Sequence, residues 1–359
     1  MTPALKELAR RPSRWLDASG PHSEVVLSTR VRLARNVLGA PFTHRAREEQ
    51  LHQVLHSVVS AARRTGSLRD SVLLRMGDLA GLDRQFLVER HLVSHDLVEG
   101  SSTRGLLLGP DETASIMINE EDHLRLQVIH SGFQLAESWR SANHLDDELD
   151  GLLDYAFSEE LGYLTACPTN AGTGLRCSVL IHLPALVLTK QITKVLQGVT
   201  QVGLAVRGFY GEGSEVMGNF FQVSNQTTLG HREKETAENL ERVTRQLIEY
   251  EEKAREVLLR DARLQIEDKI YRALGTLAYC RSIGSQETLN LSSAVRFGVA
   301  LELPGLPPLP VLNEILVFSQ PAHLQRMLGR EIGPTERNVA RAEYVRGRLN
   351  SNETRADRA

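Results

Sequence analysis

The sequence predicts an α+β fold, an antiparallel sheet flanked by helices and followed by an all-helical C-terminal domain. Up to about residue 230, short apolar runs typical of strands alternate with stretches of helical spacing. Over residues 236–277 the chain is almost without glycine or proline, and its apolar residues recur at helical spacing. The length of 359 residues suits about two domains, so we expect one domain over residues 1–235 and a second over residues 236–359.

The first domain is expected to begin with a short helical segment and then to alternate between helices and strands. The turn GPDE at 109–112 joins two apolar runs and predicts a β-hairpin. The expected helices cover residues 1–20, 46–65, 81–94 and 133–157. The expected strands cover residues 24–27, 105–108, 115–119, 124–129, 178–183, 201–207 and 219–225.

The second domain is expected to be helical, opening with either two helices or one long helix and then a turn at Gly284. The sequence LPGLPPLP at 303–310 interrupts the helical pattern because proline breaks the hydrogen-bond ladder. Thr335 is a plausible N-cap for the last helix. The expected segments are helical structure over 236–277, an apolar segment at 292–303, helices over 312–318, 321–328 and 334–349, and a frayed polar tail over 351–359.

The composition argues against several classes of protein. The chain has no run of about 18 apolar residues and no N-terminal apolar core of signal-peptide type, so we expect no membrane span and no secretion. A formal net charge of −3 gives no reason to expect direct nucleic-acid binding. Cys167, Cys177 and Cys280 show no paired metal-binding spacing. An odd number of thiols without a signal peptide is typical of the reducing cytoplasm.

The residues that point to a chemistry are arginines in strand or loop patterns. The sequence lacks a Walker loop, a GxGxxG motif after a strand, and the HRD and DFG motifs of protein kinases. STRVR at 28–32 instead places Arg30 and Arg32 on one face of an extended segment, and Arg125, Arg176 and Arg207 stand beside unusual loops. Of the 42 basic residues, six are lysine and 36 are arginine. Such a bias fits a GC-rich genome, bidentate phosphate binding, or both.

Five sequence blocks carry a resemblance to a known family. CPTNAGTGLR at 167–176 resembles the signature of the phosphagen (guanidino) kinases, and the other four blocks follow the order of that family. These blocks are STRVRLARN at 28–36, NEEDHLR at 119–125, RGFYGEGSE at 207–215 and SNQTTLG at 224–230. The resemblance covers about residues 24–254 and is strongest to the bacterial protein-arginine kinase branch. Small-molecule phosphagen kinases carry a helical domain before the first block, which here begins at residue 28, and this chain has a helical C-terminal domain in its place.

The resemblance implies that the chain binds ATP. In the family, the five arginines form a cradle for the triphosphate, and His91 matches a nucleotide-contacting histidine. A second family histidine is replaced by Leu180. Mg²⁺ is expected to be held mainly by the nucleotide phosphates, with no dedicated protein site for a metal. The implied ATP-binding residues are Ser28, Thr29, Arg30, Val31, Arg32, His91, Arg125, Arg176, Cys177, Ser178, Val179, Leu180, Arg207, Gly208, Phe209, Tyr210, Gly211 and Glu212.

The resemblance also implies a set of catalytic residues. A guanidinium group is a poor nucleophile, so carboxylates must align it and accept a proton, and Glu121 and Glu212 match the family's two substrate carboxylates. Cys167, beside Thr169, is expected to act electrostatically as a thiolate and not as a covalent nucleophile. The alternative for Cys167 is a buried, purely structural cysteine, as we expect for Cys177 and Cys280.

A block in the second domain, RNVARA at 337–342, resembles the RDxxRA block with which protein-arginine kinases bind phosphoarginine. The implied allosteric residues are Arg337, Asn338, Arg341 and Ala342, with Asn338 where the family has aspartate. The alternative is a solvated, arginine-rich helix face. The long amphipathic helices of this domain also lead us to expect a homodimer.

The expected function is therefore ATP-dependent phosphorylation of arginine side chains in proteins, which marks proteins for degradation and regulates the heat-shock response. The resemblance implies a zinc-binding activator protein, a heat-shock repressor and a Clp chaperone-protease as partners. Two alternatives stay open: a small-molecule guanidino kinase, and a non-catalytic regulator that binds phosphoarginine. The presence of Glu121, Glu212 and all five cradle arginines argues against the second alternative.

Overall fold

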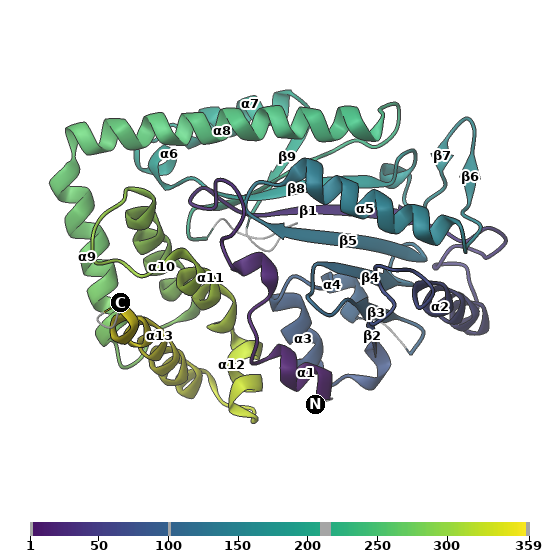
Figure 1. Cartoon of the computed structure of the whole chain (residues 1–359), viewed down its shortest axis with the longest axis horizontal. Helices are drawn as coiled ribbons and strands as arrows, with labels where there is room; N and C mark the ends of the chain where they lie inside the picture. The colour runs from purple at the N-terminus through teal and green to yellow at the C-terminus, as the bar shows by residue number, and fades with distance from the viewer. Residues whose placement is uncertain (1–2, 100–101, 209–216, 357–359) are drawn as a thin grey trace.

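The computed structural model of the chain describes residues 3–99, 102–208 and 217–356. Its centre is an eight-stranded sheet with the order β2-β3-β4-β5-β1-β8-β10-β9, in which all neighbouring strands are antiparallel (Figure 1). The strands are β1 Val26–Arg35, β2 Val72–Arg75, β3 Gly105–Leu108, β4 Ala114–Ile118, β5 Leu124–Ser131, β8 Leu175–His182, β9 Leu204–Arg207 and β10 Phe220–Asn225. A small hairpin pairs β6 Phe157–Ser158 with β7 Gly162–Tyr163. The predicted fold class is confirmed.

Helices surround this sheet, and the last five of them gather at one end of the molecule (Figure 1). Up to the end of the sheet-covering helix α8, the helices are α1 Pro3–Leu8, α2 Glu48–Ala62, α3 Gly81–Glu89, α4 His95–Val98, α5 Leu135–Asp150, α6 Pro184–Leu188, α7 Ile192–Gln201 and α8 Glu233–Asp261. The C-terminal helices are α9 Arg263–Tyr279, α10 Ser285–Ala300, α11 Leu309–Phe318, α12 Pro321–Leu328 and α13 Pro334–Ala356. Short 3-10 turns cover Arg14–Leu16, Met76–Asp78 and Pro168–Asn170.

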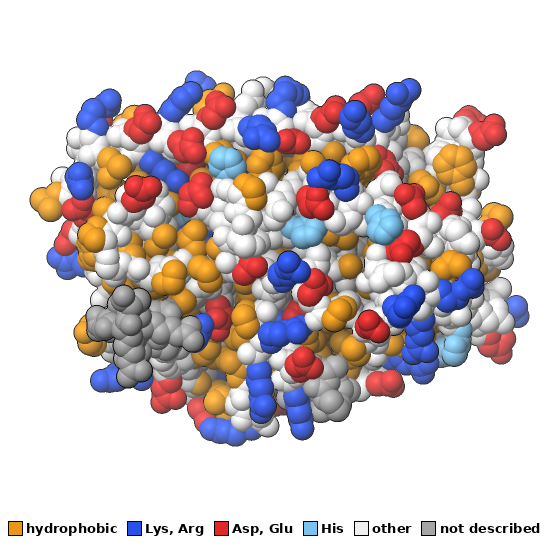
Figure 2. Space-filling view, viewed as in Figure 1, with side chains coloured by type: hydrophobic (Ala, Val, Ile, Leu, Met, Phe, Trp, Pro, Cys, Tyr) orange, Lys and Arg blue, Asp and Glu red, His pale blue; other side chains and the backbone are white. Residues whose placement is uncertain are grey.

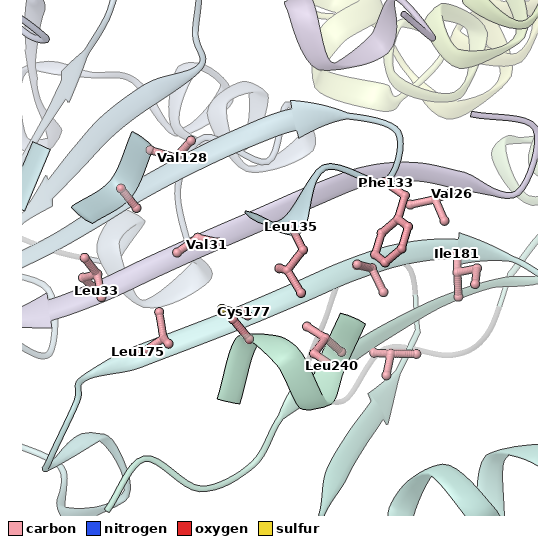
Figure 3. Close-up of a cluster of buried hydrophobic side chains, with 14 of the residues drawn as sticks. Val26, Val31, Leu33, Val128, Phe133, Leu135, Leu175, Cys177, Ile181 and Leu240 are labelled. Carbon is pink, nitrogen blue, oxygen red and sulfur yellow. The ribbon is translucent and has the colours of Figure 1, made fainter. Parts of the chain in front are cut away.

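One face of the sheet carries the main hydrophobic core. Val31 and Leu33 of β1 alternate with polar residues, and they pack with β5, β8, α5 and α8 in one buried cluster (Figure 3). Burying an aliphatic side chain of this size contributes roughly 1.5–3 kcal/mol. Because successive residues of a strand point to opposite faces, the intervening positions Arg30 and Arg32 lie on the other face.

The second, opposite face of the sheet, which carries Arg30 and Arg32, is covered by helices at its two ends and less so in the middle. At the β3–β4 end, α1, α3 and α4 pack on a cluster that includes Leu106 and Met117. At the β8–β10 end, Trp15, Leu180 and Phe220 form another cluster with residues of α10 and α11. The face between these two clusters is where the arginine-bearing parts of β1, β5 and β8 lie.

The outer surface of α8 is polar, as expected for a helix with one face on the core. Ion pairs such as Arg245–Glu241 connect residues four apart along it, and acidic and basic side chains are interspersed over this part of the surface (Figure 2). Among the described residues, no helix combines the length and the hydropathy that crossing a bilayer requires.

The structure modifies several predicted elements. The strand expected at 24–27 is the much longer β1, which includes the STRVR motif. The helix expected over 133–157 ends at Asp150, because the chain then turns into the β6–β7 hairpin. Thr335 lies inside α13, which begins at Pro334, so the N-cap prediction is wrong. The short elements β2, α4, α6, α7, β6 and β7 were not predicted.

Candidate active site

Five arginines on four strands project from the second face of the sheet. Arg30 and Arg32 are two residues apart on β1, and Arg32 lies directly opposite Arg176 of β8. The strand register also places Arg125 of β5 and Arg207 of β9 on the same face of the sheet as these arginines. Residues that oppose each other in such a register point to the same side of the sheet. We call this group the arginine cradle.

The cradle lines a cleft of about 460 Å³. Residues from loops and helices above the sheet complete the cleft, so side chains that are distant in sequence meet there. Of the residues singled out in the sequence, the cleft brings together Arg30, Arg32, His91, Arg125, Arg176, Arg207, Glu121 and Cys167. Residues that the sequence reasoning did not single out and that also line it include Ser94, Gln127, Asn170 and Gln222.

The crowding of positive charge in the cradle is electrostatically unfavourable. Burial, together with the charges of Arg125 and Arg176, lowers the pKa of Arg30 to about 10. Burial and the neighbouring arginines hold the pKa of Arg32 well below its usual range, and only Glu120 opposes this effect. Within the described residues, the buried Nε of Arg32 also has no hydrogen-bond partner. These features fit a polyanion such as a triphosphate, whose oxygens would satisfy both charge and hydrogen bonding.

Glu120 holds one cradle arginine in place. Its carboxylate is almost fully buried, forms an ion pair with Arg125 and accepts a hydrogen bond from the Ser94 hydroxyl. Ser94 also caps α4, because its Oγ accepts a hydrogen bond from the backbone N–H of Leu97. Since Glu120 and Ser94 orient Arg125, they support the cradle from the side of α4.

The strand pleat changes the set of side chains that can reach a nucleotide. Thr29 and Val31 of β1, and Cys177 and Val179 of β8, lie on the core side of their strands and are buried there. Thr29 donates its hydroxyl hydrogen to the carbonyl of Gly132, and burial raises the pKa of the Cys177 thiol. These four side chains therefore do not line the cleft, and the assignment of their residues to ATP binding stays a prediction, while the burial of Cys177 fits the structural role expected for it.

A second, small cavity of about 20 Å³ adjoins the cleft at His91. Ser28, Ser178 and Leu180 line this cavity, as does Trp15. The indole Nε1 of Trp15 is buried and has no hydrogen-bond partner among the residues that the structure describes. An unpaired buried donor is costly, so this end of the site is suited to a ligand that offers an acceptor.

His91 connects the small cavity and the cleft. Its backbone is in the left-handed region, with φ of 59°, and its carbonyl accepts a hydrogen bond from Gln127 Nε2. The imidazole packs edge-on against Trp15, with 5.5 Å between ring centroids. Burial and the nearby charge of Arg30 lower the pKa of His91 to about 3, so the ring is neutral at neutral pH.

Glu121 and Cys167 lie on the loop side of the cleft. The side-chain amide of Asn170 donates to Glu121 Oε2 at 3.0 Å, which fixes the carboxylate. Glu121 also borders a further cavity of about 550 Å³ that Thr43, His44 and Arg104 help to line. Cys167 is half-buried, and its Sγ is 2.9 Å from the Thr169 hydroxyl oxygen, so the fully buried alternative for this cysteine is wrong.

Asp122 joins the two loops that carry these residues. Its buried Oδ1 accepts hydrogen bonds from Asn36 Nδ2 and from the backbone N–H of Ala166, both at 2.7 Å. The loop before Cys167 is thereby attached to the turn that contains Glu121. The sequence signal for this role is the position of Asp122 inside the NEED block, directly after Glu121.

Part of the predicted site lies outside the described residues. Phe209, Tyr210, Gly211 and Glu212 belong to this part, and their roles stay predictions. Gly208 is described and is buried at the end of β9. Within the described chain, the one group of three close side chains of metal-binding type is His22, Glu24 and Glu252, and it does not line the cleft.

The second predicted site, on α13, has a different geometry from the one expected. Arg341 is almost fully buried, and its guanidinium donates to the carbonyls of Ser319 and Ile283 and to Asn338 Oδ1, at 2.7–2.8 Å. Arg341 is thus not a solvated side chain, and its part in binding phosphoarginine stays a prediction; Ala342 is buried in the helical core. Arg337 is half-exposed.

Comparisons with known proteins agree with this geometry. A family model described as ATP:guanido phosphotransferase, C-terminal catalytic domain, matches residues 53–254. The duplicated taurocyamine kinase from Schistosoma mansoni, solved with bound transition-state analog components, is 26% identical with a TM-score of 0.56, over 66% of this chain and 33% of that chain. Lombricine kinase, at 23% identity and a TM-score of 0.57 over 69% of this chain and 75% of that one, shares the fold. Fold and cleft thus define a phosphotransferase of the ATP:guanido class.

The C-terminal helices and the full-length relatives narrow this class. A model of the protein-arginine kinase McsB C-terminal domain matches residues 263–359. A protein-arginine kinase from Desulforamulus reducens is 49% identical over 97% of this chain and 99% of its own length. One from Bacillus subtilis is 44% identical over 94% of this chain and 93% of its own. The chain belongs to the protein-arginine kinase family.

Proposed function

We propose that this chain transfers the γ-phosphoryl group of ATP to arginine side chains of proteins. The observation that carries the proposal is the composition of the cleft, which is lined both by the arginine cradle and by a carboxylate held in place by a hydrogen bond. Arg30 and Arg32 have pKa values lowered by burial and by their like-charged neighbours, and Glu121 lines the same cavity. One side of the cleft thus suits a polyphosphate, and the other suits a cation.

The arginine cradle would bind and orient the triphosphate. Phosphoryl transfer depends mainly on alignment and on neutralising the charge of the phosphoryl oxygens, and arginine supplies both with fixed, forked hydrogen bonds. Mg²⁺ bound with ATP would add positive charge at the phosphates, next to the charge that the arginines supply. Beside the small cavity, the indole of Trp15 and the neutral ring of His91 would pack near the base, in place of the family histidine that Leu180 replaces.

Glu121 would hold the guanidinium of the acceptor arginine. The carboxylate, oriented by Asn170, aligns the attacking nitrogen and accepts the proton that the nitrogen loses as the N–P bond forms and the bond to ADP breaks. Glu212 is proposed as the second carboxylate. Cys167 lines the same cleft, and as a thiolate it would favour the positive charge of the guanidinium.

A protein acceptor is favoured over a small guanidino compound by the full-length relatives. The relatives that are named protein-arginine kinase align with nearly the whole of this chain. The taurocyamine and lombricine kinase structures match only about two-thirds of it. The test is the incubation of the chain with ATP and Mg²⁺ and either an arginine-rich protein or free arginine. We expect phosphoarginine on the protein. Transfer to free arginine alone would favour the small-molecule alternative, and binding without transfer would favour a non-catalytic regulator.

The cellular role follows from the family and not from the cleft. We propose that the chain acts in the cytoplasm as a homodimer, marks proteins for degradation and regulates the heat-shock response. Its partners would be a zinc-binding activator protein, a heat-shock repressor and a Clp chaperone-protease. Co-purification with tagged chain under heat stress tests the partners, and light scattering of the purified chain tests the dimer.

For the phosphoarginine site we propose a narrower set of residues than the sequence suggests. Half-exposed Arg337 would contact the phosphate, while Arg341 fixes Asn338 and the adjoining helix ends. Calorimetry with phosphoarginine on the Glu121→Gln background tests this division. Arg337→Ala should remove binding at this site with little loss of stability, and Arg341→Ala should mainly destabilise the fold.

A further inference from the structure

Three consecutive residues at the end of α3 connect parts of the molecule that are far apart in sequence. Glu89 and Arg90 are buried, and they contact the C-terminal helix α12 and the N-terminal segment before β1. His91, the next residue, borders both the cleft and the small cavity. Arg90 does not line either cavity.

Arg90 binds several partners at once. Its guanidinium forms an ion pair with Glu112, with hydrogen bonds of 2.7–3.1 Å to both carboxylate oxygens. It also donates to the hydroxyl of Ser13 at 2.8 Å and to the carbonyl of Arg11 at 3.0 Å. Its Nη1 is 3.3 Å from Nε2 of His323 on α12. The N-terminal segment, the β3–β4 turn and α12 therefore meet at one buried side chain.

Glu112 strengthens this connection from the turn. It is buried, its backbone is in the left-handed region with φ of 63°, and its Oε2 accepts the hydroxyl hydrogen of Ser13 at 2.7 Å. Ser13 precedes the short 3-10 turn that contains Trp15. Because Arg90 and Glu112 both bind Ser13, they fix the start of the turn that brings Trp15 against His91.

Glu89 connects the end of α3 to the C-terminal helix α12. Its carboxylate accepts hydrogen bonds from the backbone N–H groups of Ala322 and His323 at 2.9–3.0 Å, which caps α12. His323 packs edge-on against Phe86 of α3, with 4.8 Å between ring centroids. Docking of α12 is thus coupled to the position of the end of α3.

We propose that Arg90 is a positioning residue, which holds His91 and Trp15 in place at the nucleotide end of the cleft. The inference rests on the proposed nucleotide site and deepens it, because affinity for ATP then depends on the seating of α12 against α3. Buried ion pairs are poor sources of net stability, so the role we assign to the Arg90–Glu112 pair is to fix one arrangement of the residues around it. Arg90 acts through His91 and the turn that carries Trp15, so it is not a catalytic residue.

The test uses the full chain and the double variant Arg90→Met/Glu112→Gln, which leaves no unpaired buried charge. The matched control is Arg255→Met/Glu251→Gln, a buried pair on α8 that contacts α6 and does not line the cleft. Nucleotide affinity is measured with a fluorescent ATP analogue, and KM for ATP and kcat are measured separately. Thermal unfolding reports the loss of stability for both variants.

We expect the Arg90 variant to weaken nucleotide binding by about tenfold or more with a smaller change in kcat, and the control to leave affinity unchanged. In the His91→Ala background the same substitutions should have a clearly smaller effect than in the parent, because part of the action of Arg90 passes through His91 and the remainder through the turn that carries Trp15. A folded Arg90 variant with parental affinity would overturn the proposal, as would an equal loss of affinity in the control or full additivity with His91→Ala. Since affinity is read without turnover, a parent chain that binds ATP but transfers no phosphate would refute the proposed function alone.

Discussion

Neighbouring arginines on β1 differ in what balances their charge. Arg35 points to the core side, where burial alone would lower its pKa, but Asp146 raises it through hydrogen bonds of 2.6–3.1 Å. Its guanidinium also lies 3.5 Å from the ring centroid of Tyr163. Arg30 and Arg32 point to the other side, where the nearest charges are mostly those of other arginines. One strand thus carries an arginine used for structure and two cleft-facing arginines whose charges the described side chains balance only in part.

This difference follows from the period of the strand. From Thr29 to Arg35, the odd-numbered residues of β1 face the core, where an uncompensated charge would be prohibitive, so Arg35 has a carboxylate partner. The even-numbered Arg30 and Arg32 face the cleft, where their positive charge is poorly balanced by the surrounding side chains. The comparison predicts that substitutions at the two kinds of arginine have opposite consequences for activity and stability.

The largest effect is expected for Arg32→Met, which keeps the length of the side chain and removes its charge. Phosphotransfer should fall about 10³-fold, as is typical when an arginine that stabilises a transferring phosphoryl group is lost. Steady-state kinetics with saturating protein acceptor measure the fall. Activity within a few-fold of the parent would contradict the role of the cradle.

Arg35→Met is the matched substitution on the core side of the same strand. It leaves Asp146 buried without its partner, so the free energy of unfolding should fall by about 3–5 kcal/mol. Urea unfolding followed by circular dichroism measures this change. The fraction that stays folded should retain the affinity of the parent for ATP; if it loses this affinity while stability is unchanged, the distinction between the two faces fails.

Glu121→Gln tests the cation side of the cleft. The amide keeps the size of the carboxylate but cannot accept the proton, so kcat should fall by about 10²-fold or more. Binding of ATP, which depends on the arginine cradle, should be retained within a few-fold. A loss of nucleotide affinity with kcat maintained would show that Glu121 serves the binding of ATP and not the acceptor guanidinium.

A smaller effect concerns the pH dependence of stability at Glu89. Burial raises its pKa to about 7, against the lowering effects of the N–H groups of Ala322 and His323, of Gln85 and of Arg341. Because the folded state holds the proton more tightly, the contribution of Glu89 to stability is fully present below about pH 4.5 and is lost as the pH rises through about 7. The loss between pH 5 and pH 8 should be about 2–3 kcal/mol and should be absent in Glu89→Gln, as measured by unfolding at these two pH values. An equal change in the free energy of unfolding between the two pH values for the parent and for Glu89→Gln would refute this prediction.

The period-two pattern of the STRVR motif was enough to place Arg30 and Arg32 on one face of a strand. The same rule turns the side chains of Val31, Cys177 and Val179 toward the core, so a contact of these residues with ATP would have to involve their backbone atoms. The cleft residues that could be predicted lie inside short blocks. Asn170 and Asp122 also lie there, but their roles depend on a loop geometry that spacing does not reveal.

The roles of the buried arginines outside the cleft could not be predicted, because they depend on hydrogen-bond partners that are distant in sequence. Arg341 is held by the carbonyls of Ser319 and Ile283, which are 22 and 58 residues away. Arg90 meets Glu112 and an N-terminal segment 77–79 residues earlier in the chain. A pattern of arginines on one helix face does not distinguish such a buried side chain from a ligand-binding one.

The central claim is that the cradle's unfavourable charge is relieved by the phosphates of ATP, and thermal unfolding with and without ATP and Mg²⁺ tests it most directly. The account predicts that ATP at 100 times its Kd stabilises the parent by about 2.7 kcal/mol. Without ATP, Arg32→Met should be at least as stable as the parent, because it relieves repulsion, and ATP should add little to it. A variant that is less stable than the parent without ATP, yet is stabilised by ATP to the same extent, would contradict the account.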